Sequence, residues 1–128
     1  MHDINGAVKP MKISNTIIKS LLAKLPNQEV VFYGAGENMK AILRAYRECG
    51  LNFDYTIWDI NAQNILTVQG ERVSKPDLET VVRGKTAVIT IGEPFINFTV
   101  SRRLALLGYN VINAPKELSE TAGGGVSL

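Results

Sequence analysis

The stretch Val30-Val-Phe-Tyr-Gly-Ala-Gly-Glu37 decides how the rest of the sequence is interpreted. Its four β-branched or aromatic residues in a row are typical of a short strand buried on both faces of a parallel sheet. The two glycines permit a tight turn after that strand. Apolar residues then recur at helical spacing: Met39, Ile42, Leu43 and Tyr46. The stretch therefore predicts a strand, a tight turn and a helix.

The same alternation continues along the chain. Strands are predicted at 53–58, 71–73, 86–91 and 109–112, and helices at 14–25, from 74 to about 82, and from 94 to 107. The helix from 74 to about 82 is predicted from Ser74-Lys-Pro-Asp77. This segment has a capping residue, an early proline and an acid three places on, the order typical of a helix N-terminus. Strands alternating with helices indicate βαβ units and right-handed crossovers. We predict the α/β class and a three-layer, Rossmann-like parallel sheet with the strand order 3-2-1-4-5.

The length of 128 residues predicts one domain. We assign residues 29–113 to the Rossmann-like domain. Residues 1–28 are predicted to form an N-terminal segment with a leading amphipathic helix, and residues 114–128 a flexible C-terminal tail that contains Gly123-Gly-Gly125.

The composition excludes several classes of site. The only cysteine is Cys49 and the only histidine is His2, so an internal disulfide, a zinc site and histidine chemistry are not expected. Cys49 is expected to be a buried, unreactive thiol. A net charge of +2 is too small for a nucleic-acid footprint. No apolar run approaches the ~20 residues of a membrane span, and no signal-peptide pattern is found, so we expect a cytoplasmic protein.

The predicted strand order brings the first and fourth strands together, and ligands of such sheets bind at the carboxyl ends of neighbouring strands. Gly36 would let phosphate oxygens approach the backbone at the N-terminus of a helix, and Asp59 would accept hydrogen bonds from ribose hydroxyls. Asn97 is expected to face the same crevice. The predicted binding residues are Gly34, Ala35, Gly36, Glu37, Asn38, Asp59, Asn61, Gly92 and Glu93.

Each of these features also has a purely structural interpretation. The glycines could serve only the tight turn, and Met39, which stands where the dinucleotide fingerprint has its third glycine, could serve only core packing. Glu93-Pro94 could be no more than the start of a helix. Glu37 would repel a bound phosphate unless its side chain turned outward.

Five segments together resemble a known family. They are Val30–Glu37, Trp58-Asp-Ile-Asn61, Gly70-Glu-Arg-Val73, Pro76-Asp-Leu-Glu79 and Val88-Ile-Thr-Ile-Gly92. In this order they resemble the nucleotide-sugar-binding domains of bacterial surface-polysaccharide enzymes, namely sugar acetyltransferases and the cofactor-like domains of nucleoside-diphosphate-sugar dehydratases and epimerases. The resemblance covers about residues 29–113. It implies that Gly34, Gly36, Asp59 and Gly92 frame a site for a nucleotide or nucleotide sugar.

Two departures from such enzymes limit what the resemblance implies. The sequence lacks the hexapeptide repeat that carries the acetyltransferase histidine, and none of its tyrosines begins the Tyr-x-x-x-Lys pair of the dehydrogenases. We therefore predict a non-catalytic or partner-dependent binding domain for a nucleotide or nucleotide sugar, with a protein partner or a second copy of the chain. One alternative is an enzyme subunit that uses NAD or S-adenosylmethionine and is completed by another chain. Another is a protein interaction domain with an empty site.

Overall fold

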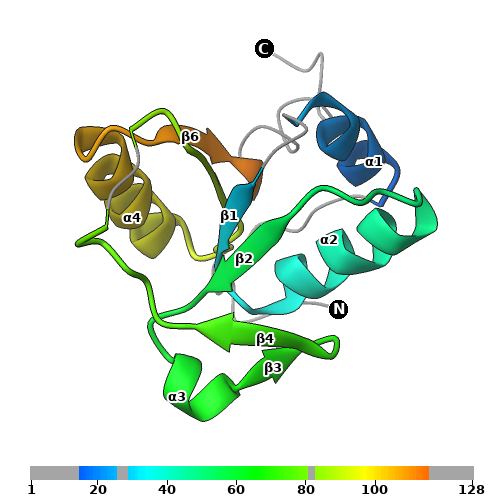
Figure 1. Cartoon of the computed structure of the whole chain (residues 1–128), viewed down its shortest axis with the longest axis horizontal. Coiled ribbons are helices and arrows are strands. Elements are labelled where there is room, and N and C mark those ends of the chain that lie inside the picture. Colours follow the sequence, from blue (N-terminus) through cyan, green and yellow to red (C-terminus); the bar gives the residue numbers. More distant parts are fainter. Residues whose placement is uncertain (1–14, 26–28, 81–82, 116–128) are drawn as a thin grey trace, which may run out of the picture.

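The computed structural model describes residues 15–25, 29–80 and 83–115. They form an α/β structure in which one mostly parallel sheet of six strands has helices on both faces (Figure 1). The sheet order is β3-β4-β2-β1-β5-β6, and every pair is parallel except β3 with β4. The strands are β1 (Val30–Tyr33), β2 (Tyr55–Trp58), β3 (Thr67–Val68), β4 (Glu71–Ser74), β5 (Thr86–Ile89) and β6 (Asn110–Asn113).

This order differs from the predicted 3-2-1-4-5 because an antiparallel strand, β3, adds to one edge of the sheet. The extra strand arises from a two-residue turn. Gln69 and Gly70 both have positive φ angles, 51° and 82°, and such turns match the twist of a hairpin. The turn folds β4 back onto β3, so the stretch 61–69, which was not expected to contain a strand, joins the sheet.

Two layers of helices enclose the sheet. The helices α1 (Asn15–Lys24) and α2 (Glu37–Glu48) cover one face, and α4 (Pro94–Leu106) covers the other (Figure 1). The short helix α3 (Ala62–Ile65) lies between β2 and β3. Along β1, Val30 and Phe32 pack with α1 and α2, whereas Val31 and Tyr33 pack on the α4 side. Burial on both faces explains why this strand has no polar residue.

The larger hydrophobic core lies between the sheet and the α1/α2 layer. Ile18 and Leu22 from α1 have 0% and 2% of their surface exposed, and Met39 and Ile42 from α2 are fully buried. In the smaller core, on the α4 side, the Trp58 ring of β2 packs edge-on against the rings of Tyr33 and Tyr109. The leading helix, which the sequence separates from residues 29–113, therefore contributes to the same core as the sheet.

The helix predicted from Ser74 is absent from residues 75–80. Ser74 is instead the last residue of β4, and its carbonyl accepts a hydrogen bond from the Asp59 amide. The Asp77 side chain does accept from the amides of Glu79 and Thr80, as a capping residue would. A residue that precedes proline avoids the helical region, so Lys75 continues the extended chain. The crossover from β4 to β5 thus has no helix over these six residues.

Other differences are smaller. Strands β2 and β5 are shorter than predicted, and Cys49 is exposed because it lies just past the last residue of α2. The predicted tail lies outside the described residues from 116 onward, as do positions 1–14, 26–28 and 81–82. None of the helices in the described ranges is long and apolar enough to cross a membrane.

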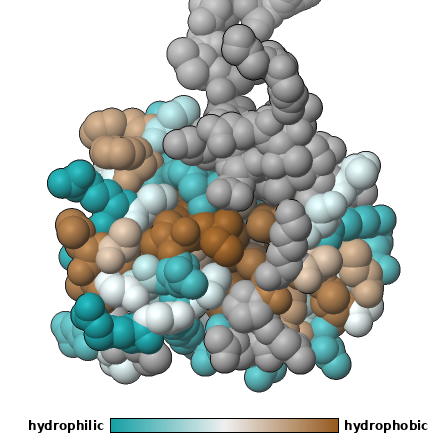
Figure 2. Space-filling model, turned by 90° about the horizontal axis from the view of Figure 1, so that it is seen from above, coloured by the Kyte–Doolittle hydropathy of each residue, from teal (hydrophilic) through white to brown (hydrophobic). Residues whose placement is uncertain are grey.

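The surface is not uniformly polar. Seen from above in Figure 2, hydrophobic residues gather in the middle of that face, and more of them lie near its left and right edges among hydrophilic residues. Four of the large hydrophobic side chains that remain exposed belong to α4, which is therefore apolar on more than its inner side. The exposed set is Ile60, Leu66, Phe95, Ile96, Phe98 and Leu106.

Candidate functional site

A cavity of about 360 Å³ lies where β1 and β5 end, next to the first turn of α2. We call it the glycine-loop cavity. The structure places eight of the nine predicted binding residues around it, together with Thr90 and Ile91. The ninth, Asn61, lines a neighbouring cavity instead. The eight are Gly34, Ala35, Gly36, Glu37, Asn38, Asp59, Gly92 and Glu93.

The two glycines of the loop differ in what requires them. Gly34 has φ +125°, and a β-carbon there would lie 2.5 Å from the Thr90 hydroxyl. Its amide donates to the Trp58 carbonyl at 2.8 Å, which fixes it between β2 and β5. Gly36 has φ −96°, and a β-carbon there would meet no atom within 4 Å. The turn therefore explains Gly34, whereas at Gly36 neither conformation nor packing demands a glycine.

Thr90 holds the ends of β1 and β5 together, a role that the sequence analysis missed. Its side chain is 2% exposed, and its hydroxyl donates to the Gly34 and Tyr33 carbonyls, with oxygen distances of 2.9 and 3.1 Å. The side-chain amide of Asn38 in turn donates to the Thr90 carbonyl at 3.0 Å. The sequence did contain a signal for this role, which is the hydroxyl of Thr90 inside the apolar run Val88-Ile-Thr-Ile91. A polar group buried in a strand needs a hydrogen-bond partner, so it indicates a contact with a neighbouring segment.

Asp59 already has partners within the protein. Its Oδ2 accepts from the Ala35 amide and its Oδ1 from the Asn61 amide, both at 2.8 Å. The carboxylate therefore fixes the glycine loop and the start of α3. Each carboxylate oxygen has a second lone pair, so both can accept further hydrogen bonds from a ligand.

Acidic side chains dominate the charge around this cavity. Glu37, Asp59 and Glu93 line it, and no lysine or arginine does so among the described residues. The Glu37 side chain is 87% exposed, and its carboxylate pairs with Lys40 at 2.9 Å, so it turns outward. Glu93 caps α4, because its Oε1 accepts from the Ile96 amide at 2.8 Å. Both possibilities for Glu93 thus coexist, since the residue starts a helix and also borders the cavity.

Asn97 does not face the crevice, so that expectation was wrong. The residue is 1% exposed. Its side-chain amide donates to the Ile91 carbonyl at 2.7 Å and to the side-chain oxygen of Asn113 at 3.1 Å. A polar residue one turn into α4 was consistent with a ligand contact, but its position on the inner side of the helix buries it. Asn97 instead joins α4 to the ends of β5 and β6.

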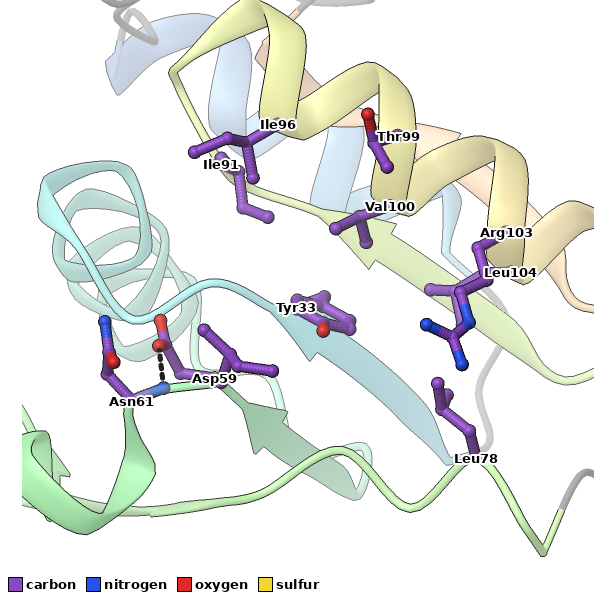
Figure 3. Close-up of a pocket in the computed structure, with 11 residues that line it drawn as sticks. Tyr33, Asp59, Asn61, Leu78, Ile91, Ile96, Thr99, Val100, Arg103 and Leu104 are labelled. Carbon is purple, nitrogen blue, oxygen red and sulfur yellow. Dashed lines mark hydrogen bonds between the residues drawn. The ribbon is translucent and has the colours of Figure 1, made fainter.

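A second cavity, of about 410 Å³, adjoins the first at Asp59 and Ile91 and lies between the sheet and α4 (Figure 3). We call it the α4 cavity. Tyr33 lies between its two ends. Burial raises the pKa of the Tyr33 hydroxyl, and the Asp59 carboxylate raises it further while Arg103 lowers it.

The described residues contain no group of three histidine, cysteine or acidic side chains arranged to hold a metal ion. Compared with known proteins, the chain matches no family model, no curated protein and no solved structure. The likeness to nucleotide-sugar-binding domains therefore stays a hypothesis drawn from the motifs. The evidence for a function comes from the geometry of the two cavities.

Proposed function

We propose that the chain is a binding module with a Rossmann-like fold that holds a nucleotide or nucleotide sugar in the glycine-loop cavity. The observation that carries the proposal is Gly36. The open space in front of its α-carbon lies inside a cavity at the carboxyl ends of parallel strands, where ligands of such sheets bind. A ligand that approaches the backbone closely would account for a glycine here beyond the general preference for glycine at an N-cap such as that of α2.

The framework around this cavity supports the proposal because it is fixed before any ligand arrives. Thr90, Asn38 and Asp59 hold the loop from three directions through hydrogen bonds of 2.8–3.1 Å. A preformed site binds more tightly, because less conformational entropy is lost when the ligand binds. Asp59 would accept ribose hydroxyls through its remaining lone pairs, and the outward position of Glu37 leaves the first turn of α2 accessible to a phosphate.

The test is a thermal-shift panel of uridine and adenine nucleotides, nucleotide sugars, NAD and S-adenosylmethionine at millimolar concentration. At least one nucleotide or nucleotide sugar should stabilise the wild-type chain, by about 2.7 kcal/mol at one hundred times its dissociation constant. Gly36→Asp should abolish that shift, because it introduces bulk and negative charge into the cavity. The matched control is Asn110→Asp, which adds the same charge at an exposed position where β6 begins.

Two results would contradict the proposal: no stabilisation by any compound, or equal stabilisation of wild type and Gly36→Asp. Stabilisation by NAD or S-adenosylmethionine alone would favour the enzyme-subunit alternative. Asp59→Ala is a less selective variant, because it also releases the Ala35 amide from its partner. The predicted cytoplasmic location stays a prediction.

The exposed side of α4 favours a second candidate function, protein interaction. Phe95, Phe98 and Leu106 are 74%, 61% and 76% exposed. Large apolar side chains gathered on one exposed helix can mark an interface. Light scattering at micromolar concentration should then show association that Phe98→Ser weakens. A strictly monomeric wild-type chain would exclude a second copy as the partner.

A further inference from the structure

The α4 cavity has a different chemical character from the glycine-loop cavity. Its walls are mostly apolar, and they include Tyr33, Leu78, Ile91 and Val100. Its volume of about 410 Å³ lies within the range of roughly 300–1,000 Å³ typical of small-molecule sites. An apolar hollow of this size is suited to a flat ring or a short branched chain.

The absence of a helix from residues 75–80 explains why the hollow exists. In a sheet of this topology the crossover from β4 to β5 passes over the face that α4 also covers, and a helix there would pack beside α4. Here Leu78 is the residue of the described crossover that lines the cavity. The space between Leu78 and α4 therefore stays open (Figure 3).

The two ends of the cavity carry opposite charge. Asp59 and Asn61 lie at one end and Arg103, in the last turn of α4, lies at the other, with Tyr33 between them (Figure 3). The Arg103 guanidinium extends toward Leu78 and forms no salt bridge with any residue that the structure describes. A guanidinium beside an apolar wall, without an ion-pair partner in the described ranges, matches the carboxylate or phosphate of an amphipathic ligand.

We propose that the α4 cavity is a second binding site, which takes a small amphipathic anion. The aryl or short acyl body of the ligand lies against Tyr33, Leu78 and Val100, and its carboxylate or phosphate pairs with Arg103. The opposite orientation would place the anion beside the Asp59 carboxylate, which repels it. This site goes beyond the proposed nucleotide site, because its anion lies at Arg103 and away from the glycine loop.

The test uses two dyes that differ in charge. Anilinonaphthalene sulfonate is an aromatic anion, and phenyl naphthylamine has the same rings without the sulfonate. Wild-type chain should bind both saturably. Arg103→Gln should weaken sulfonate binding about tenfold and change binding of the neutral dye by less than about twofold. Arg102→Gln is the matched control, since the neighbouring arginine is also exposed but does not line the cavity.

Two further variants locate the dyes. Thr99→Phe fills part of the cavity at an exposed position of α4, so it should weaken both dyes while the near-ultraviolet circular dichroism stays that of the folded chain. Gly36→Asp should leave both dyes bound as in wild type, even if it abolishes nucleotide binding. This independence separates a failure of the α4 site from a failure of the nucleotide site.

Competition then identifies the anion. Displacement of the sulfonate dye by phenyl phosphate, but not by benzoate or phenylacetate, assigns a phosphate ligand, and the reverse assigns a carboxylate. The proposal is overturned by equal effects of Arg102→Gln and Arg103→Gln, by unchanged dye binding in Thr99→Phe, by the lack of saturable binding, or by displacement with neither class of anion.

Discussion

At the scale of single residues, the two glycines of the loop separate structural from functional constraint. Gly34→Ala should lower the free energy of unfolding by about 1–3 kcal/mol, because the new methyl group meets the Thr90 hydroxyl and the backbone keeps a positive φ. Gly36→Ala should change it by less than about 1 kcal/mol in either direction, because its φ suits alanine whereas the N-cap position of α2 favours glycine. Urea unfolding followed by circular dichroism measures both. Equal destabilisation of the two variants would mean that Gly36 is also required by the fold.

Asp59 shows why a residue's position does not reveal its whole role. Its place at the end of β2 was read from the sequence, and the carboxylate does border the glycine-loop cavity. Its bond to the Ala35 amide, 24 residues away in the chain, depends on how two loops meet, which no local pattern encodes, whereas its bond to the Asn61 amide is a local turn contact. Thr90 was missed for the same reason, because its partners are 56 and 57 residues away in the chain.

At the scale of elements, the start of α4 depends on Glu93. Its carboxylate accepts from the Ile96 amide, and Pro94 occupies the first helical turn. Glu93→Ala should cost about 1 kcal/mol of unfolding free energy, because that amide loses its side-chain partner. Glu93→Ser keeps a capping oxygen and should restore most of the loss. The same urea titration measures both variants, and an alanine variant as stable as wild type would show that the cap contributes nothing.

Where α2 meets β2, a cluster of aromatic side chains makes stability depend on alkaline pH. Burial and a hydrogen bond to Glu71 raise the pKa of Tyr55 to about 12, from 10.0 for an ordinary tyrosine. Because the folded state has the higher pKa, this contribution is complete below about pH 10 and is lost as the pH rises toward 12.

The free energy of unfolding of the wild-type chain should therefore fall between about pH 8 and pH 11 by about 1 kcal/mol more than that of Tyr55→Phe. The phenylalanine variant is the control, because it keeps the ring contacts with Phe32 and Tyr46 and loses only the titrating hydroxyl. Parallel pH dependence of the two chains would refute the assignment to Tyr55.

The elements that were predicted follow from local sequence patterns, whereas those that were missed depend on contacts or turns that such patterns do not report. The strand at 30–33 and the helix after it follow from a local apolar run and its periodicity, and the structure has both. The helix at 74–82 was predicted from a capping pattern alone. Residues 75–80 form no helix, because Ser74 belongs to β4 and pairs with Trp58 of β2. A local capping pattern does not report such a contact between strands. Strand β3 was missed because Gln69-Gly70 is a less familiar turn sequence than Asn-Gly.

At the scale of the whole molecule, the two faces of the sheet differ in how completely they are covered. On one face, α1 and α2 pack side by side over fully buried residues. On the other face α4 is joined by a crossover without a helix over residues 75–80, and the α4 cavity lies there. We therefore expect the α1/α2 side to supply most of the stability, whereas the α4 side leaves room for the α4 cavity. The division into a leading segment and a domain at 29–113 stays a prediction.

Removal of residues 1–28 tests directly how much of the stability comes from the α1/α2 side. It takes Ile18 and Leu22 out of the core, and single truncations of such side chains cost about 2–5 kcal/mol each, against about 5–15 kcal/mol for a whole domain. The shortened chain should therefore unfold at a much lower urea concentration than the full chain, or not fold at all. Leu22→Ala should lose about 2–4 kcal/mol, whereas Lys19→Ala, which removes only an exposed ion pair with Glu48, should lose less than about 1 kcal/mol. If the shortened chain unfolds at the same midpoint as the full one, α1 is an accessory helix and residues 29–113 are the folding unit, because the sheet would then be stable with its α2 layer alone.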